Sequence, residues 1–404
     1  MSSVLIIGGG AAGMAAAIAA AACGDQVTVL ERMDRVGKKI LATGNGRCNL
    51  MNTGAARFPG GSDFADQVLS RCGVQEQTCF WKYLGLRMRM EDGGRVYPVS
   101  GAASTVLDAM RQAMRLLGVT TVTDEEITSL HKAGKAWIAE GKQRYKGDRV
   151  IVAGGGCAQP KLGSNGSAWP LLTQLGHSLV RPRPALTQII TDTAPIRGLS
   201  GIRVRCNVSV IGKGGEKVRQ SGELLFADYG VTGVCVMQCA RWANEGDMVW
   251  IDLTPALGFD SEDALREELM RRRDVWSGMS QLELLTGLCV PKLAMALLRE
   301  AGVEKPSERP ASALRPAAVA HLARICSDLR LKVKGVKGFD SAQVTAGGIR
   351  TEEFDPATMA SLLAPGVHAA GEMLDVDGDC GGFNLMFAFG SGILAGLNGR
   401  KAPW

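Results

Sequence analysis

Residues 4–31 read VLIIGGGAAGMAAAIAAAACGDQVTVLE, and this stretch decides the fold. Its first four residues form a short apolar run that is typical of a strand buried on both faces. Three glycines, Gly8, Gly10 and Gly13, then make the pattern G-x-G-x-x-G and lead into an alanine-rich segment that predicts a helix. A second predicted strand ends at Glu31. The order strand, glycine turn, helix, strand and acid indicates a Rossmann-type βαβ unit.

Each glycine has a separate physical role in such a unit. Gly8 permits the tight turn, Gly10 lets the backbone approach a pyrophosphate, and Gly13 lets the helix pack closely on the strand. The N-terminus of the helix offers unpaired N–H groups and partial positive charge to phosphates. Glu31 is placed to accept hydrogen bonds from the hydroxyls of a ribose. We therefore expect a dinucleotide at this site.

The next segment, residues 35–50 (RVGKKILATGNGRCNL), is rich in glycine, lysine and asparagine. Such a loop can run along the ribityl chain and the ring edge of a flavin, where it supplies amide and backbone donors. A solvated basic loop is the alternative that these residues leave open.

The blocks GGGAAGMAAAIAA (8–20) and GKKILATGNGRCN (37–49) resemble the YhiN/BaiN-like flavoproteins, also called aminoacetone oxidase-like FAD-binding enzymes. Three later blocks, 94–100, 160–177 and 370–385, are similar to that family in the same order. The resemblance implies FAD as the cofactor, and either amine oxidation or reduction of an activated double bond. It also implies a Rossmann-like FAD domain, a small β-barrel-like insert and a helical lobe.

The chain departs from the family pattern on the substrate side. Ala153–Gly156 stands where the family commonly has a threonine, and residues 227–228 and 386–387 also differ from its usual ones. These changes hardly affect the expected FAD contacts, but they leave the substrate unassigned.

Alternating strand and helix patterns occupy both ends of the chain, and the middle is first strand-like and then helical. We expect an α/β fold in which residues 1–190 and 335–404 form one discontinuous, Rossmann-like FAD-binding domain. Residues 191–256 are predicted to form the inserted β-rich domain, and residues 257–334 the helical lobe.

The expected FAD contacts come from the glycine turn, the acid, the following loop, a later glycine run and the C-terminal block. They are Gly8, Gly10, Ala11, Ala12, Gly13, Glu31, Arg32, Lys38, Lys39, Thr43, Gly44, Asn45, Gly46, Cys48, Asn49, Ile127, Ala153, Gly154, Gly155, Gly371, Glu372, Phe383, Asn384 and Leu385. No catalytic residue is assigned. The later glycine run is followed by Cys157 and does not complete a second G-x-G-x-x-G, so the sequence shows no second Rossmann site for NAD(P)H. Reduction of the flavin by NAD(P)H that binds only transiently stays an open alternative.

Composition excludes several classes of protein. The 404-residue chain has 11 cysteines without a C-x-x-C pair, and its four histidines lack metal-ligand spacing, so we expect neither a disulfide scaffold nor a metal site. The acidic run DVDGD (375–379) lacks the glutamate of a calcium loop, because the twelfth position is Met386. Reduced thiols and glycine-broken apolar stretches favour a cytoplasmic protein without a membrane segment.

Two classes of function stay open. The leading one is an FAD-dependent oxidoreductase that transfers hydride or electrons between NAD(P)H or oxygen and a small organic substrate through flavin N5. The alternative is a flavoprotein that binds RNA or a protein partner, with FAD in a structural or redox-sensing role. The net charge of +6 and the basic clusters 271–273 and 332–337 are better explained as solvated charge, so nucleic acid is not the expected partner. The sequence does not indicate the oligomeric state.

We expect the purified protein to be yellow and to release FAD rather than FMN on heat denaturation. FMN has no adenosine ribose for Glu31 to bind, and the glycine turn fits a pyrophosphate. Chromatography of the released pigment checks this expectation. Colourless protein that FAD cannot reconstitute would contradict it.

Overall fold

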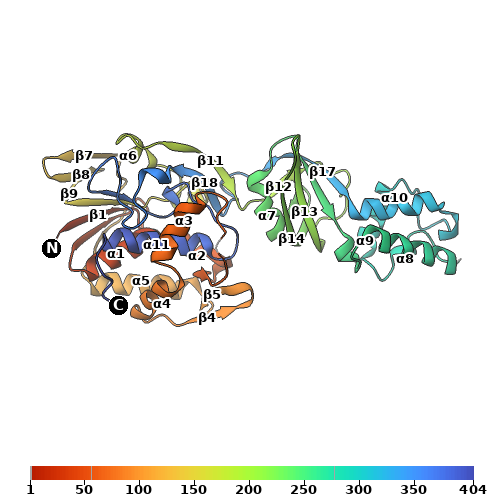
Figure 1. Ribbon diagram of the computed structural model, residues 1–404, viewed down its shortest axis with the longest axis horizontal. Helices are drawn as coiled ribbons and strands as arrows, with labels where there is room; N and C mark the ends of the chain where they lie inside the picture. Colours follow the sequence, from red (N-terminus) through yellow and green to blue (C-terminus); the bar gives the residue numbers. More distant parts are fainter. Residues whose placement is uncertain (1, 56, 277) are drawn as a thin grey trace. The chain divides into compact units, whose positions relative to one another are not determined.

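The structure, a computed structural model, describes residues 2–55, 57–276 and 278–404. It divides into two compact units. One consists of Met1–Pro184 and Ala342–Trp404, and the other of Ala185–Ser341. The first unit is therefore interrupted in the sequence by the second (Figure 1).

A parallel sheet forms the centre of the first unit. Its strands are, in spatial order, β19 (Val367–Ala369), β10 (Arg149–Val152), β1 (Ser3–Ile7), β2 (Gln26–Leu30) and β6 (Thr120–Val122). The apolar residues of β1 are buried, as expected for a strand with neighbours on both sides and cover on both faces. Because β1 is central, its carboxyl end carries the glycine turn to the middle of one sheet edge.

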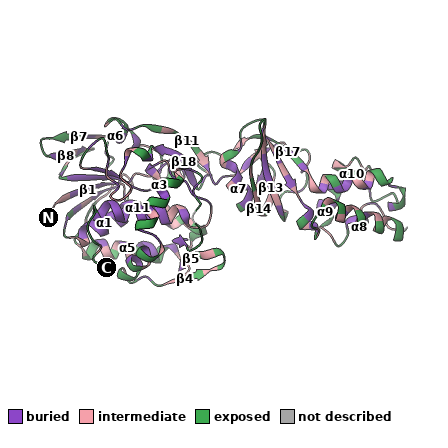
Figure 2. Cartoon of the chain, in the orientation of Figure 1, coloured by how far each residue is buried: buried purple, intermediate pink, exposed green. Residues whose placement is uncertain are grey.

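Two helices from opposite ends of the chain pack on each other beside this sheet. They are α1 (Ala11–Ala22) and α11 (Phe383–Leu397). A Cβ at Gly392 would overlap the carbonyl oxygen of Ala12, and Gly396 makes an equally close approach one turn later. Figure 2 shows both helices as largely buried. In the described part of the chain, none of the helices combines the length and the apolarity that crossing a bilayer requires.

The remaining elements of the first unit cover this sheet and its edges. The helices are α2 (Lys38–Ala42), α3 (Ser62–Arg71), α4 (Val74–Tyr83), α5 (Ala103–Leu116) and α6 (Trp169–Thr173). One antiparallel sheet consists of β3 (Met51–Asn52), β5 (Arg95–Pro98) and β4 (Met88–Glu91), and another of β7 (Ser129–Ala133), β8 (Ala136–Glu140) and β9 (Arg144–Gly147). A two-stranded sheet pairs β11 (Leu179–Ala185) with β18 (Val344–Ile349). Residues 145–152 have the sequence pattern of one continuous strand, but β9 and β10 are separate strands in different sheets. The chain turns between them at Asp148, whose carboxylate accepts a hydrogen bond from the Ser3 N–H at 2.8 Å.

The second unit contains a closed barrel and a group of helices. The barrel strands are, in spatial order, β12 (Ile189–Thr191), β15 (Gly230–Thr232), β14 (Gly215–Ala227), β13 (Arg203–Gly212), β16 (Met248–Asp252) and β17 (Leu329–Val336). The helices are α7 (Val234–Cys239), α8 (Glu262–Val275), α9 (Pro291–Glu300) and α10 (Pro316–Ser327). This arrangement confirms the predicted α/β fold with a β-barrel insert and a helical region.

Local sequence signals set several boundaries in the second unit. The glycine-rich segment 212–215, whose composition is typical of a hairpin turn, connects β13 and β14. Ser261 caps α8 by accepting a hydrogen bond from the Ala264 N–H at 3.2 Å. The pattern of residues 281–300 is helical with an interruption near Pro291, and α9 begins at Pro291, because proline lacks the N–H that an interior helical position needs and fits the first turn.

A buried ion cluster fastens the end of α11 to the central sheet. Arg149, at the start of β10, donates to the carbonyl oxygens of Ala395 and Gly396 at 2.8 Å and pairs with Asp25 at 2.9 Å. Arg400 pairs with the same carboxylate. Burial alone would raise the pKa of Asp25, but the hydrogen bonds from the two arginines outweigh it and hold that pKa well below its usual range.

Arg149→Met should lower the free energy of unfolding by about 3 kcal/mol, because two carbonyl oxygens and part of a carboxylate lose their buried donor. Arg144→Met, which removes an exposed ion pair with Glu140, is the matched control and should cost less than about 1 kcal/mol. Urea denaturation at neutral pH measures both values.

The cost of Arg149→Met should also shrink as the pH falls below the ordinary aspartate pKa of 3.8. A carboxylate with a depressed pKa stabilises the fold above its unfolded-state pKa, and that stability is lost as the pH falls toward the folded-state pKa. A cost that stays constant from neutral pH down to about pH 3 would show that Asp25 does not contribute through its charge.

Candidate functional site

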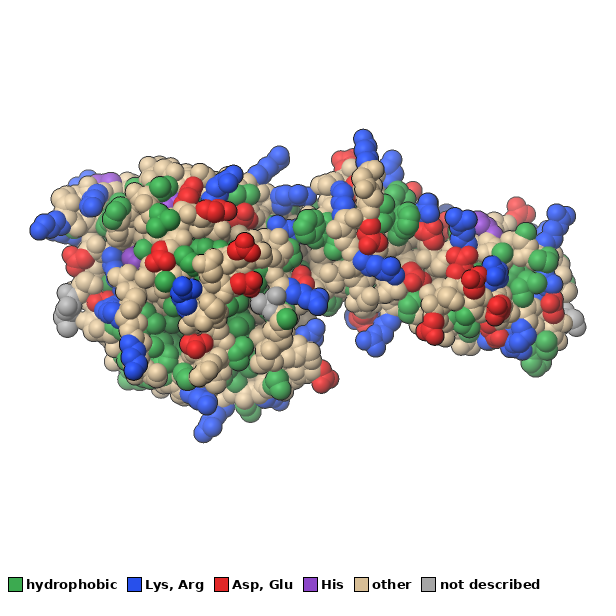
Figure 3. Space-filling view, in the orientation of Figure 1, with side chains coloured by type: hydrophobic (Ala, Val, Ile, Leu, Met, Phe, Trp, Pro, Cys, Tyr) green, Lys and Arg blue, Asp and Glu red, His purple; other side chains and the backbone are tan. Residues whose placement is uncertain are grey.

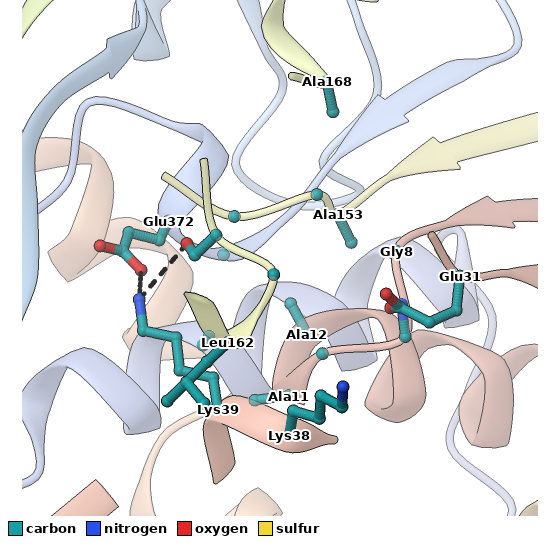
Figure 4. Close-up of a pocket in the computed structure, with 18 of the residues that line it drawn as sticks. Gly8, Ala11, Ala12, Glu31, Lys38, Lys39, Ala153, Leu162, Ala168 and Glu372 are labelled. Atoms are coloured by element: carbon teal, nitrogen blue, oxygen red, sulfur yellow. Dashed lines mark hydrogen bonds and ion pairs between the residues drawn. The ribbon is translucent and has the colours of Figure 1, made fainter. Parts of the chain in front are cut away.

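A pocket lies at the carboxyl ends of β1, β2 and β10, within the first unit. Its walls come from the glycine turn, the N-termini of α1 and α11, and the segments that follow β2 and β10. Parallel sheets of this type bind ligands beyond the carboxyl ends of their strands. Figure 4 shows Gly8 and Glu31 on one side of the pocket and Lys39 with Glu372 on the other.

Most of the predicted cofactor residues line this pocket. They are Gly8, Gly10, Ala11, Ala12, Glu31, Arg32, Lys38, Lys39, Thr43, Ile127, Ala153, Gly154, Gly155, Gly371, Glu372, Asn384 and Leu385. The other predicted residues do not line it: Gly13, Gly44, Asn45, Gly46, Cys48, Asn49 and Phe383. The fold thus brings together side chains and backbone from both ends of the sequence.

The glycine turn has the shape that the sequence pattern predicts. Gly8 has a φ of +102°, and a Cβ there would come within 2.5 Å of the Ala153 carbonyl oxygen. A Cβ at Gly13 would overlap the carbonyl oxygen of Gly8. At Gly10, in contrast, a Cβ would meet no protein atom within 4 Å. Gly8 and Gly13 are therefore required by the protein itself, whereas Gly10 leaves open space beside the backbone, as a cradle for a pyrophosphate does.

Glu31 is held in place by backbone donors at the end of β2. Its carboxylate accepts hydrogen bonds from the N–H groups of Gly9 at 2.7 Å and Met33 at 2.8 Å. These two bonds use one lone pair on each oxygen, so each oxygen can accept one more hydrogen bond. A ribose with two neighbouring hydroxyls matches this set of acceptors.

An ion pair forms the opposite side of the pocket. The Lys39 ammonium lies 2.6 Å from a carboxylate oxygen of Glu372 and 3.4 Å from the Ser164 hydroxyl (Figure 4). The other carboxylate oxygen of Glu372 accepts the N–H of Thr345 at 2.7 Å. The charges of both side chains are therefore fixed in position by at least two contacts.

The N-terminus of α11 reaches the same pocket through Asn384, Leu385, Phe387 and Ala388. The Asn384 amide is occupied by the preceding loop, since it accepts the Gly378 N–H and donates to the Gly378 carbonyl oxygen, both at 2.8 Å. It fixes the start of the helix instead of offering a free side chain. The helix N-terminus itself supplies partial positive charge at this end of the pocket.

Five of the predicted residues that do not line the pocket lie in one loop that directly follows Thr43, which does line it: Gly44, Asn45, Gly46, Cys48 and Asn49. Asn45 and Cys48 have positive φ values of 55° and 57°, so the chain reverses direction within this short loop. Cys48 is fully buried, and burial raises the pKa of its thiol to about 11. The Asn49 side-chain oxygen is also buried, and it has no hydrogen-bond partner among the described residues. A buried acceptor normally has a donor, and the described residues do not provide one for this oxygen.

Some lining residues were not selected from the sequence. Gln343 and Val344 follow the second unit in the chain and belong to no motif, so only the fold reveals their place. Ser164 lies in a block that resembles the flavoprotein family, which was the available signal for it. Within the described residues, histidine, cysteine and carboxylate side chains form no group of three or more that could hold a metal ion.

Comparison with known proteins agrees with this geometry. Residues 2–398 match the family model described as the HI0933-like protein Rossmann domain. The chain belongs to this family. The match confirms the flavoprotein family predicted from the sequence blocks, and with it an FAD-dependent oxidoreductase built on a Rossmann-type domain.

Relatives in this family carry different names. The 3-dehydro-bile acid delta(4,6)-reductase of Clostridium scindens is 38% identical, with 100% of each chain covered. The ribosomal RNA dihydrouridine synthase of Haemophilus influenzae is 25% identical, with 98% of each chain covered. Among solved structures, a 3-ketosteroid-delta4-(5alpha)-dehydrogenase from Rhodococcus jostii RHA1 is 16% identical, with a TM-score of 0.47 and coverage of 99% of this chain and 97% of its own.

Gly10→Val should abolish FAD binding and leave the protein folded, because a Cβ at this position meets no other residue within 4 Å and the added side chain would occupy the space beside the backbone that a pyrophosphate needs. Gly13→Val is the contrasting variant and should fail to fold, since its Cβ would overlap the Gly8 carbonyl oxygen. Flavin content per chain and circular dichroism measure the two outcomes. Full flavin content in folded Gly10→Val would place the cofactor elsewhere.

Proposed function

We propose that the chain is an FAD-dependent reductase that adds hydride to a carbon–carbon double bond conjugated with a carbonyl group, using NAD(P)H as the source of electrons. The observation that carries this proposal is a pocket that joins Glu31, the glycine turn and the N-terminus of α11. Its expected substrate is a small organic molecule.

The names of two relatives support this choice of reaction. A 3-dehydro-delta(4,6) bile acid has, by its name, a 3-oxo group conjugated with the double bonds that the Clostridium scindens enzyme is named for reducing. Dihydrouridine differs from uridine by two hydrogens on a double bond that is conjugated with a ring carbonyl. The two substrates are unlike in size and polarity, but the bond that is reduced is of the same kind. We infer that members of the family share the reduction of such a conjugated double bond, and that their substrate pockets differ.

The residues of the pocket fit FAD in an extended conformation. Glu31 would bind the adenosine ribose, and the backbone at Gly10 with the first turn of α1 would bind the pyrophosphate. The Lys39–Glu372 pair would lie along the ribityl chain, with the N-terminus of α11 at the ring. Bound FAD would supply a hydride acceptor and donor at N5. The partial positive charge of the α11 N-terminus favours an anionic group at this end of the pocket.

A relay through the thiol of Cys48 or Cys157 does not fit the described contacts. Such a relay needs a nucleophilic thiolate beside a second thiol. Burial raises the thiol pKa of both Cys48 and Cys157, and neither residue lines the pocket. All eleven cysteines are free thiols, which is consistent with the reducing conditions of the cytoplasm, and we place the protein there.

The proposal is tested by anaerobic reduction followed by reoxidation. NADH or NADPH should bleach the flavin absorbance, and a 3-oxo-4-ene steroid acid should restore it and yield the saturated ketone. An otherwise similar steroid acid with an isolated double bond should leave the flavin reduced, because hydride addition to it gives no stabilised enolate. Folded Gly10→Val protein is the control and should show neither step.

Two outcomes would overturn the proposal. Reoxidation by molecular oxygen alone, with every conjugated ketone inactive, would indicate an oxidase. If neither NADH nor NADPH reduces the flavin, NAD(P)H is not the source of electrons.

A further inference from the structure

The strand β13 extends beyond its neighbour β16 at one end of the barrel. It runs from Arg203 to Gly212 and pairs with β14 along its whole length. On its other side it pairs with β16 only from Asn207 to Ile211. Among the described residues, none of the other strands or isolated bridges takes the place of β16 beside residues 203–206. We call this four-residue stretch the open edge of β13.

The open edge presents backbone donors and acceptors at Arg203 and Arg205. The carbonyl oxygen of Ile202 accepts the N–H of Phe226 at 3.0 Å, so Ile202 directs its carbonyl group toward the β14 side. Successive residues of a strand direct their backbone groups to opposite sides. The N–H and C=O groups of Arg203 and Arg205 therefore point to the side that β16 does not cover. An edge of this kind can pair with one more extended chain.

The open edge lies in an apolar groove within the second unit. Besides the edge itself, the groove is lined by Pro255 and Ala256, which follow β16, and by Leu288, Val290 and Leu293 around the start of α9. The side chain of Val290 is 52% exposed, so this apolar surface is open to solvent. Figure 3 shows hydrophobic side chains beside lysine and arginine side chains on the visible face of the second unit.

Arg205 adds a positive charge to the open edge. Its side chain is exposed and, in the part of the chain that the structure describes, forms no ion pair. The nearby carboxylates already have partners. Glu223, opposite Arg205 on β14, pairs with Arg203 at 2.7 Å. Asp252 accepts a hydrogen bond from the side chain of Asn207 at 2.9 Å. The charge of Arg205 is therefore available to a ligand.

We propose that the open edge of β13 binds an extended, acidic segment of a partner protein as an added antiparallel strand. Opposite residues of paired strands share a face, and successive residues alternate between faces. Residues of the added strand that lie opposite Arg203 and Arg205 would therefore be acidic, and the residue between them, opposite Val204, would be apolar. The recognised pattern is acidic–apolar–acidic.

A second copy of this chain does not fit the open edge. Antiparallel pairing of two such edges would place arginine opposite arginine, and like charges at opposite positions destabilise a sheet. A small amphipathic acid would use the apolar groove and the charge of Arg205, but it has no row of backbone groups for the edge. An acidic strand uses all three features.

The test is a fluorescence anisotropy titration of a fluorescein-labelled heptapeptide of alternating valine and glutamate with the FAD-loaded protein, at about 50 mM KCl. No reductant or substrate is present, so the result is independent of the proposed reductase activity. We expect saturable binding. Methylation of the glutamate backbone nitrogens should weaken binding at least about tenfold, because these N–H groups face the edge. Methylation of the valine nitrogens is the matched control and should change binding less than about threefold, because those N–H groups point away.

Variants of the protein test the same contact from the other side. Arg205→Val removes the charge and keeps the edge N–H, and it should weaken binding of the unmethylated peptide. Arg205→Pro removes both, and it should weaken binding further, while an edge position tolerates proline. Arg219→Val makes the same charge change at an exposed position of β14 outside the open edge, and it should bind within about twofold of the unaltered protein. Circular dichroism and flavin content confirm that each variant is folded.

Three results would overturn the proposal: no saturable binding at protein concentrations up to about 1 mM, equal binding of the two methylated peptides, or equal losses in Arg205→Val and Arg219→Val. Displacement of the labelled peptide by dodecanoate as effective as displacement by unlabelled peptide would also overturn it, and would identify a site for small amphipathic acids instead.

Discussion

The close packing of α1 on α11 is the constraint on which the cofactor pocket depends. Gly392 and Gly396 allow the two backbones to touch, so the helices approach more closely than larger side chains would permit. Each helix presents its N-terminus to the pocket, one beside the glycine turn and one at the opposite end. The distance between the two positively charged helix N-termini therefore depends on the lack of side chains at Gly392 and Gly396. Arg149 secures the same arrangement by binding the last carbonyl groups of α11.

The parts of the site that were predictable from the sequence are those encoded by neighbouring residues. The glycine turn and Glu31 belong to one βαβ unit, where strand, turn and helix follow directly from apolar runs and glycine spacing. The fold class was predictable from the same kind of local signal. The hydrophobic periodicity along the chain changes from alternating strands and helices to strands alone and then to helices.

Contacts between distant segments could not be predicted in this way. Lys39 meets Glu372 across 333 residues, and Gln343 enters the pocket only because the chain returns from the second unit beside it. Trp250 and Arg330 meet through strand pairing in the barrel. Such pairs depend on topology, and a single sequence gives no local signal for them.

His177 illustrates how hydrogen-bond geometry alone can mislead. Its ring contacts Glu353 at 2.8 Å and Ser361 at 2.9 Å. Serine, histidine and carboxylate thus follow one another as they do in a catalytic triad. The imidazole is fully buried, however, and stacks on Phe354 with 4.5 Å between ring centres. The Ser361 oxygen also accepts the N–H of Ala364 at 2.8 Å. These three residues join distant loops, which indicates a structural role for this histidine.

The α1–α11 contact also fixes an order of events during synthesis. The ribosome makes α1 first, then the whole of the second unit, and only afterwards α11. The second unit is contiguous in the sequence, whereas the first unit is completed only when β19, the edge strand of its central sheet, and α11 have been made after it. For most of its translation the nascent chain therefore exposes the surface of α1 that α11 later covers, and chaperones have their longest opportunity to bind there. Because the start of α11 lines the pocket, we expect cofactor capture to follow the synthesis of this helix, and a shortened product that lacks α11 would leave the pocket incomplete.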